Sequence, residues 1–191
     1  MTDIIQLKIT LQETNPPIWR RIQVPKSITF FDLNHVIQIA MGWTNSHIFE
    51  FVIHGYTIGW IGDEGNENEQ PIDANSVLLG LVLNQPNERF DFTYDFGDWW
   101  EHSVEVEVLL PKDEKTYPVC IGGELRCPPE DCGGIDGYYS ILEIIKDKNH
   151  RDYGITKRWL GRGYNPAKFD IAKVNKEMPN FKKWMRDWKS K

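Results

Sequence analysis

The sequence predicts an α+β fold, in which an antiparallel β-sheet is packed by helices and the C-terminal part is helical. Alternating apolar and polar residues, the pattern of half-buried strands, dominate the N-terminal and central parts of the chain. Apolar residues spaced three and four positions apart dominate the C-terminal part. Strands followed by helices are typical of α+β folds rather than of alternating βαβ units. A chain of 191 residues suits one core, so we expect residues 1–191 to form a single domain.

The first two strands are predicted over residues 4–11 and 18–24. Every second residue of the first strand is apolar: Ile5, Leu7, Ile9 and Leu11. The segment 15–17, Asn-Pro-Pro, interrupts this pattern, and alternation resumes at Ile18. In the second strand Arg20 falls on the apolar face, whereas Trp19 and Arg21 fall on the opposite face. The two strands are expected to pair.

A helix follows, with start and stop signals at both ends. Thr29 is a favourable N-cap residue, and Asp32 completes a pattern like that of a capping box. Gly42 is placed to end the helix. The apolar residues between these signals have helical spacing: Leu33, Val36, Ile37, Ala40 and Met41.

Three more strands are predicted, over residues 47–53, 90–96 and 100–108. The last two are separated by the turn residues Gly97 and Asp98, which indicates an antiparallel pair with one wet side. The acidic stretch 62–73 is expected to be a solvated loop, and residues 77–83 a short helix.

Residues 111–136 show little periodicity and are expected to form a long, functional loop. Helices are expected beyond it. The first carries an apolar stripe from Tyr138 to Ile145, and a short one ends near Leu160. The last carries four apolar residues at helical spacing: Phe181, Trp184, Met185 and Trp188.

Composition excludes several classes of protein. A net charge of −6 argues against a protein that grips nucleic acid with its whole surface, although a local basic patch stays open. No apolar run is long enough to span a membrane, and no signal peptide is visible. An odd number of cysteines, three, disfavours a disulfide framework and fits the cytoplasm. Eight tryptophans make the chain tryptophan-rich and indicate a large core or a contact surface.

Four segments together resemble the plasmid pRiA4b ORF-3-like family. They read PPIWRR, MGWTNSH, YDFGDWWEH and CPPEDCGG, at residues 16–21, 41–47, 94–102 and 127–134. The resemblance covers nearly the whole chain. It implies kinship with largely uncharacterised proteins of bacteria, archaea and mobile elements, some of which carry a resolvase-like label. The residues of this chain provide no recombinase chemistry to support that label.

Candidate catalytic residues lie in two of these segments. Asp95, Asp98, Glu101 and His102 fall within eight residues and could hold a divalent cation or share a proton. Alternatively, the two aspartates stabilise a tight turn around Gly97, and His102 is a half-buried histidine of the core. Glu130 and Asp131 follow two rigid prolines and either face a ligand or cap the next helix.

The cysteines suggest a possible zinc site. Zinc binds four ligands in a tetrahedron, but the spacing of Cys120, Cys127 and Cys132 lacks the paired C-x-x-C pattern. The fourth ligand would be one of these: His102, His47, Asp131 or water. Alternatively, the thiols pack beneath a rigid loop.

Arginine and tryptophan suggest a binding surface. Trp19, Arg20 and Arg21 suit contacts with phosphates and bases, and Trp43 and His47 are further candidates for ligand binding. The basic C-terminal tail either joins them or docks on its own domain.

Two functions are compatible with these patterns. The first is a cytoplasmic binding module for a protein or nucleic-acid partner. The alternative is a metal-assisted hydrolase-like enzyme, with a site formed by segments 95–102 and 120–134. Its candidate catalytic residues are Asp95, Asp98, His102, Glu130 and Asp131.

Overall fold

The computed structural model describes residues 2–60 and 70–183 and confirms the predicted α+β fold. Eight strands form one sheet in the order β5-β4-β3-β6-β7-β1-β2-β8. All neighbouring strands are antiparallel except β4 and β5, which are parallel. The strands are β1 (Ile4–Leu11), β2 (Ile18–Pro25), β3 (Phe49–Ile53), β4 (Tyr56–Gly59), β5 (Ile72–Asp73), β6 (Arg89–Tyr94), β7 (Trp100–Leu110) and β8 (Val119–Glu124).

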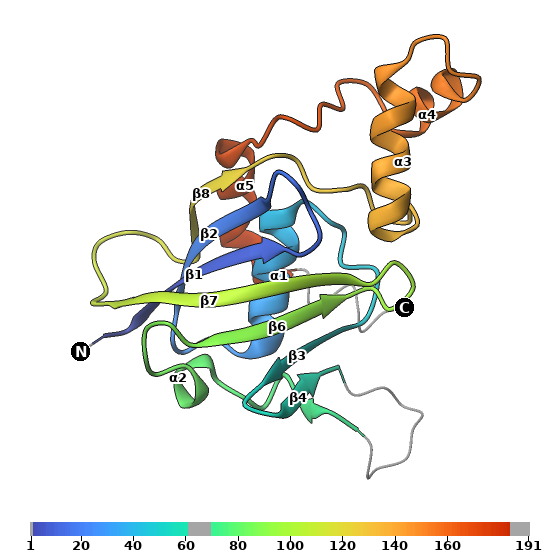
Figure 1. The fold of residues 1–191 in the computed structure, drawn as a ribbon. Coiled ribbons are helices and arrows are strands. Elements are labelled where there is room, and N and C mark those ends of the chain that lie inside the picture. Colours follow the sequence, from blue (N-terminus) through green and yellow to red (C-terminus); the bar gives the residue numbers. More distant parts are fainter. Residues whose placement is uncertain (1, 61–69, 184–191) are drawn as a thin grey trace.

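Helix α1 (Phe30–Met41) lies against one face of this sheet, and each of its residues is buried (Figure 1). The predicted capping box is present, because Thr29 Oγ1 accepts a hydrogen bond from Asp32 N at 3.0 Å and the Asp32 carboxylate accepts one from Thr29 N. Gly42 ends the helix in the left-handed conformation, with φ of 95°. The helix therefore begins and ends as the sequence predicts.

The opposite face of the sheet is polar. Gln6 and Lys8 of β1 lie beside Arg21 of β2 and Glu107 of β7. The Arg21 guanidinium donates two hydrogen bonds to the Glu107 carboxylate, at 2.6 and 2.7 Å. The hydrophobic core thus lies between the sheet and α1, and the alternation of β1 and β2 faces the directions that the sequence predicts.

The prediction of a long irregular segment over 111–136 is wrong for its central part. Residues 119–124 form the edge strand β8, which pairs with β2. Gly123 lies so close to its neighbours that a Cβ atom there would be 2.6 Å from the ring of Phe169 and 2.9 Å from Cδ of Arg20. Glycine at this position therefore allows the C-terminal segment to pack on the strand.

The C-terminal part is helical, as predicted. It contains α3 (Gly134–Lys146), α4 (Tyr153–Trp159), α5 (Ile171–Glu177) and a 3₁₀ helix, η1 (Met178–Lys183). The short predicted helix over 77–83 is α2 (Leu79–Val82). Helices α3 and α4 lie together beyond the end of the sheet, whereas α5 lies beside β8 (Figure 1).

Two predictions fall wholly or partly outside the described residues. They concern the acidic loop over 62–73, of which 62–69 are not described, and the last helix, of which Trp184, Met185 and Trp188 are not described. Within the described residues, no helix is both long enough and apolar enough to cross a membrane.

Candidate functional site

Three loops that are far apart in the sequence meet at one edge of the core. They are residues 42–48, which follow α1, residues 95–99, which join β6 to β7, and residues 125–133, which lead into α3. Each loop contains part of one of the segments that carry the family resemblance. Direct hydrogen bonds hold the loops together.

Tyr94 and Glu130 form the centre of this arrangement. The Tyr94 hydroxyl donates to Glu130 Oε1 at 2.6 Å and accepts from the backbone N–H groups of Ser46 and His47. Glu130 Oε2 accepts from both the N–H and the hydroxyl of Thr44, at 2.8 and 2.7 Å. Burial and the Glu130 carboxylate raise the pKa of Tyr94, so this phenol remains a donor. Glu130, predicted as catalytic or as a helix cap, joins two loops instead.

Asp98 holds the third loop. Its Oδ2 accepts a hydrogen bond from Cys132 N at 3.0 Å, and its Oδ1 accepts one from Gly133 N at 3.2 Å. Trp43 adds a contact further along the loop, because its indole Nε1–H donates to the carbonyl of Pro128 at 2.9 Å. The two bonds to the Asp98 carboxylate are charge-assisted and therefore stronger than neutral ones, so the loop is well fixed at Cys132 and Gly133.

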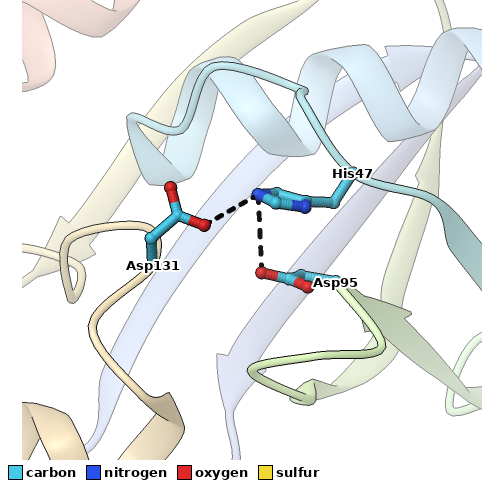
Figure 2. Close-up of side chains that lie close together, drawn as sticks. All are labelled: His47, Asp95 and Asp131. Atoms are coloured by element: carbon cyan, nitrogen blue, oxygen red, sulfur yellow. Dashed lines mark ion pairs between the residues drawn. The ribbon is translucent and has the colours of Figure 1, made fainter.

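His47, Asp95 and Asp131 point toward one another from these three loops (Figure 2). His47 Nε2 lies 3.6 Å from Asp95 Oδ2 and 3.3 Å from Asp131 Oδ1. The Asp95 side chain is 8% exposed, whereas that of Asp131 is 75% exposed. The cluster therefore has a buried side and an open side.

Backbone conformation helps to place both carboxylates. Asp95 and Asp131 have positive φ angles, 59° and 57°, which aspartate tolerates better than most residues. Asp95 also accepts a hydrogen bond from Gly97 N through Oδ1, at 2.9 Å, which leaves Oδ2 for the cluster. Asp95 thus combines the two predicted alternatives, since it stabilises the turn and also faces the site.

His102 is not part of this site. It is fully buried, with Nδ1 at 3.2 Å from the carbonyl oxygen of Phe92, and it packs against the rings of Trp43 and Phe92. Burial lowers its pKa to about 4. The alternative interpretation as a histidine of the core therefore describes its position, and the predicted pairing with Asp95 and Asp98 does not form because strand alternation turns the ring inward.

The low pKa of His102 predicts a loss of stability in acid. Below pH 6.5 the unfolded chain binds a proton at this residue, whereas the folded protein does so only near pH 4. Stability from His102 is therefore present above pH 6.5 and is lost as pH falls toward 4. Between pH 7 and 4.5 we expect wild type to lose about 2 to 3 kcal/mol more unfolding free energy than His102→Gln. Denaturant titrations of wild type and His102→Gln at the two pH values measure this difference. The contribution of His35 cancels, because His35 is buried in both proteins. Equal losses of unfolding free energy in the two proteins would show that His102 does not titrate in this way.

The three cysteines do not assemble the predicted zinc site. Cys120 and Cys132 donate to the carbonyls of Gly122 and Gly134, whereas Cys127 contacts the sulfur of Met41. Burial raises the pKa of Cys127 to about 11 and that of Cys132 to about 12, so both are neutral thiols. Among the described residues only the His47 cluster brings three potential ligand atoms within reach of one ion.

The predicted binding surface also divides. Trp19 and Arg21 lie on the polar face of the sheet, where Arg21 pairs with Glu107 and stacks at 5.0 Å on the Trp19 ring. Arg20 and Trp43 are instead buried, with 1% and 3% of their surfaces exposed. Burial keeps both side chains from forming one exposed surface with Trp19 and Arg21. Strand alternation turns Arg20 away from its two neighbours on β2.

Arg20 lines a cavity of about 530 Å³ between the end of α1, loop residues 126–130 and the C-terminal segment 159–177. Its Nε and Nη1 groups donate to the carbonyls of Ala40, Trp19 and Glu124, and its guanidinium stacks on Phe169 at 4.0 Å. No carboxylate pairs with Arg20 among the described residues. No sequence pattern predicts the cavity itself, although Arg20, Trp43 and Glu130 in its lining belong to three of the segments that carry the family resemblance.

The fold and the three converging loops define an α+β protein whose family motifs meet in space. The chain matches the family model described as plasmid pRiA4b ORF-3-like protein over residues 3–173, and it belongs to this family. It is 36% identical over 189 residues to the uncharacterized protein y4hQ of Sinorhizobium fredii (strain NBRC 101917 / NGR234), covering 97% of this chain and 96% of that protein. The crystal structure of MM3350 from Methanosarcina mazei Go1, a protein of unknown function, is similar with a TM-score of 0.79 and 37% identity, covering 89% of this chain and 96% of that one.

Proposed function

We propose that this protein is a binding module for a small molecule that has an apolar, aromatic body and an anionic group. The buried Arg20 guanidinium in the wall of the cavity carries this proposal, since no carboxylate pairs with it within residues 2–60 and 70–183. Buried charges are normally neutralised by a partner, and among the described residues Arg20 has only backbone carbonyls, a thiol and an aromatic face around it. An anion in the cavity would complete the pair.

The walls of the cavity support the same ligand class. The volume of about 530 Å³ falls within the usual range for small-molecule sites. Four aromatic residues line it: Trp43, Trp159, Tyr164 and Phe169. The cavity is lined by four basic residues, Arg20, Arg126, Lys168 and Lys173. Its lining also contains three acidic residues, Glu130, Asp170 and Glu177. Because Glu130 is already bound by Tyr94 and Thr44, the balance of free charge favours an anion.

A small ligand accounts for the structure better than the protein or nucleic-acid partner that the sequence suggested. Arg20 and Trp43 are buried, and Arg21 is paired with Glu107, so they offer no continuous basic and aromatic surface. Protein and nucleic-acid recognition generally use such exposed residues. The cavity, in contrast, is bounded on several sides.

The proposal predicts that the aromatic sulfonate 1-anilinonaphthalene-8-sulfonate binds the folded protein with a stoichiometry near one. Trp159 is 51% exposed and lines the cavity, so Trp159→Ala is expected to weaken binding about tenfold through lost stacking. Trp99→Ala is the matched control, since Trp99 is 50% exposed but lies outside the cavity. Fluorescence titration measures both constants.

Charge is tested with an uncharged probe of similar shape, N-phenyl-1-naphthylamine. We expect it to bind at least about tenfold more weakly than the sulfonate, because it lacks the group that neutralises Arg20. Equal affinities for the two probes would contradict the anionic part of the proposal. Equal losses in Trp99→Ala and Trp159→Ala would contradict the location.

A further inference from the structure

We propose that His47, Asp95 and Asp131 bind one divalent transition-metal cation of the kind represented by Zn²⁺. One imidazole nitrogen and two carboxylate oxygens from three separate loops point at a common position (Figure 2). These ligand atoms all lie within 4.8 Å of one another.

The distances between the ligand atoms fit a shared ion. Two ligands bound at about 2.1 Å to a tetrahedral zinc ion are roughly 3.4 Å apart. His47 Nε2 lies 3.3 Å from Asp131 Oδ1 and 3.6 Å from Asp95 Oδ2. Neither separation makes a hydrogen bond of good geometry, and His47 Nε2 has no hydrogen-bond partner among the described residues.

The buried side of the cluster also lacks a partner. The Asp95 side chain is more than nine-tenths buried, and within the described residues its Oδ2 receives no hydrogen bond. His47 Nε2 is shielded from solvent as well. A buried ring nitrogen without a hydrogen-bond partner is costly, and a cation shared with the adjacent Asp95 carboxylate removes that cost.

Charge around the cluster favours a cation. Asp98 and Glu130 belong to the same loop assembly as Asp95 and Asp131, so four carboxylates accompany one imidazole. Neither Asp95 nor Asp131 is paired with lysine or arginine among the described residues. This excess of negative charge favours a cation between the side chains of His47, Asp95 and Asp131.

The ligand types indicate which cation binds. Imidazole suits zinc and other first-row transition metals, whereas Mg²⁺ and Ca²⁺ prefer oxygen ligands throughout. Three protein ligands leave a coordination position for water or for a bound molecule, as in catalytic rather than structural zinc sites. The open side lies at Asp131, whose side chain is 75% exposed.

This inference is independent of the ligand proposed for the cavity. None of its three ligands lines the cavity, whereas Glu130, next to Asp131, lines the cavity and adds negative charge near the cluster. Failure of naphthalene-sulfonate binding would leave the metal site standing, and the reverse also holds.

Isothermal titration of the full chain, stripped with chelator and titrated with ZnCl₂ or MgCl₂, tests the site. We expect one Zn²⁺ per chain and much weaker binding of Mg²⁺. Loss of a ligand is expected to cost more than the roughly 10- to 100-fold that loss of an outer-shell partner costs. His47→Ala removes the nitrogen ligand, and Asp95→Asn and Asp131→Asn remove charge while asparagine still tolerates the left-handed backbone.

His150→Ala is the matched control. His150 Nδ1 also lies near a carboxylate, at 3.9 Å from Asp152 Oδ2, but the described part of the chain places no third ligand close to it. Wild-type affinity in this variant together with large losses in the three site variants supports the proposal. Zn²⁺ affinity unchanged in the site variants, or lost in His150→Ala, would overturn it.

If His47→Ala does not fold, Asp131→Asn at its exposed position provides the same test, with melting temperature as the check on folding.

Discussion

Replacement of Arg20 by alanine is expected to lower the free energy of unfolding by about 4 kcal/mol, because several contacts depend on its guanidinium. Arg20 Nε donates to the carbonyl of Ala40 at 2.8 Å, in the last turn of α1, and Nη1 donates to the carbonyl of Glu124 at 2.9 Å, at the end of β8. Alanine also removes the stack on Phe169 and leaves an empty space. Chemical denaturation with constant m-value measures the loss.

Arg21→Ala is the control for this experiment, since Arg21 is the next residue on the same strand but faces the other way. Its ion pair with Glu107 is partly exposed, with side-chain exposures of 32% and 21%. Pairs of this kind contribute about 0–1 kcal/mol. The two variants should therefore differ by roughly 3 kcal/mol. Equal losses would show that Arg20 is not the anchor between α1 and β8, and would also weaken its role in the cavity.

Arg20 and Arg21 show that a sequence pattern predicts the face on which a side chain lies but not the contacts that it makes there. Alternation correctly separates the two side chains and places β1 and β2 to within one residue, because burial of one face imposes a period of two on the sequence. The capping residues and the helical spacing of apolar residues place α1 in the same way. Alternation does not say that an arginine on the apolar face is buried and bound to carbonyls. Chemical type suggested phosphate contacts for both residues, whereas the packing of α1, β8 and Phe169 determines what each does.

Strand β8 escaped prediction for a related reason. It contains the consecutive glycines Gly122 and Gly123, which have low strand propensity and interrupt the apolar pattern. Those glycines make room for Trp19 and Phe169, side chains that come from distant parts of the sequence. Tertiary contacts of this kind leave no periodic signal.

The candidate site could be predicted in part. Sequence proximity grouped Asp95 with His102, but alternation turns His102 into the core, and the partners of Asp95 lie in two other motifs. The signal that was available is that His47, Asp95 and Asp131 each belong to a different segment of the family resemblance. Segments that distinguish a family and meet in space are good candidates for one site, whereas the distances between them follow only from the fold.

Gly137→Ala is expected to destabilise the protein by about 3 kcal/mol, although alanine is normally the better residue in a helix by about 1 kcal/mol. Gly137 lies in the first turns of α3, and a Cβ atom there would be 1.8 Å from the carbonyl oxygen of Cys132 and 2.7 Å from its carbonyl carbon. Both are backbone atoms, so no side-chain rotation relieves the clash. The loop must move, and Asp98 then loses its hydrogen bonds to Cys132 and Gly133.

Gly154→Ala is the control, because its expected change in unfolding free energy is zero or stabilising rather than destabilising. Gly154 lies in α4, and its Cβ atom would meet only the Arg158 side chain, at 3.6 Å. This variant should be neutral or gain up to about 1 kcal/mol. Thermal melting of the pair separates steric contact from helix propensity, and similar melting temperatures would contradict the close approach of α3 to the loop.

The effect of Gly137→Ala should extend to the cation proposed at His47, Asp95 and Asp131. Cys132 follows Asp131 directly, so displacement of its carbonyl moves the Asp131 carboxylate away from His47 while leaving all three ligands in the sequence. Zn²⁺ affinity should fall at least about tenfold in Gly137→Ala and remain unchanged in Gly154→Ala. A folded Gly137→Ala protein with full Zn²⁺ affinity would mean that the loop before α3 does not place the ligand. The metal would then be held by His47 and Asp95 without the geometric role that the structure gives to Asp131.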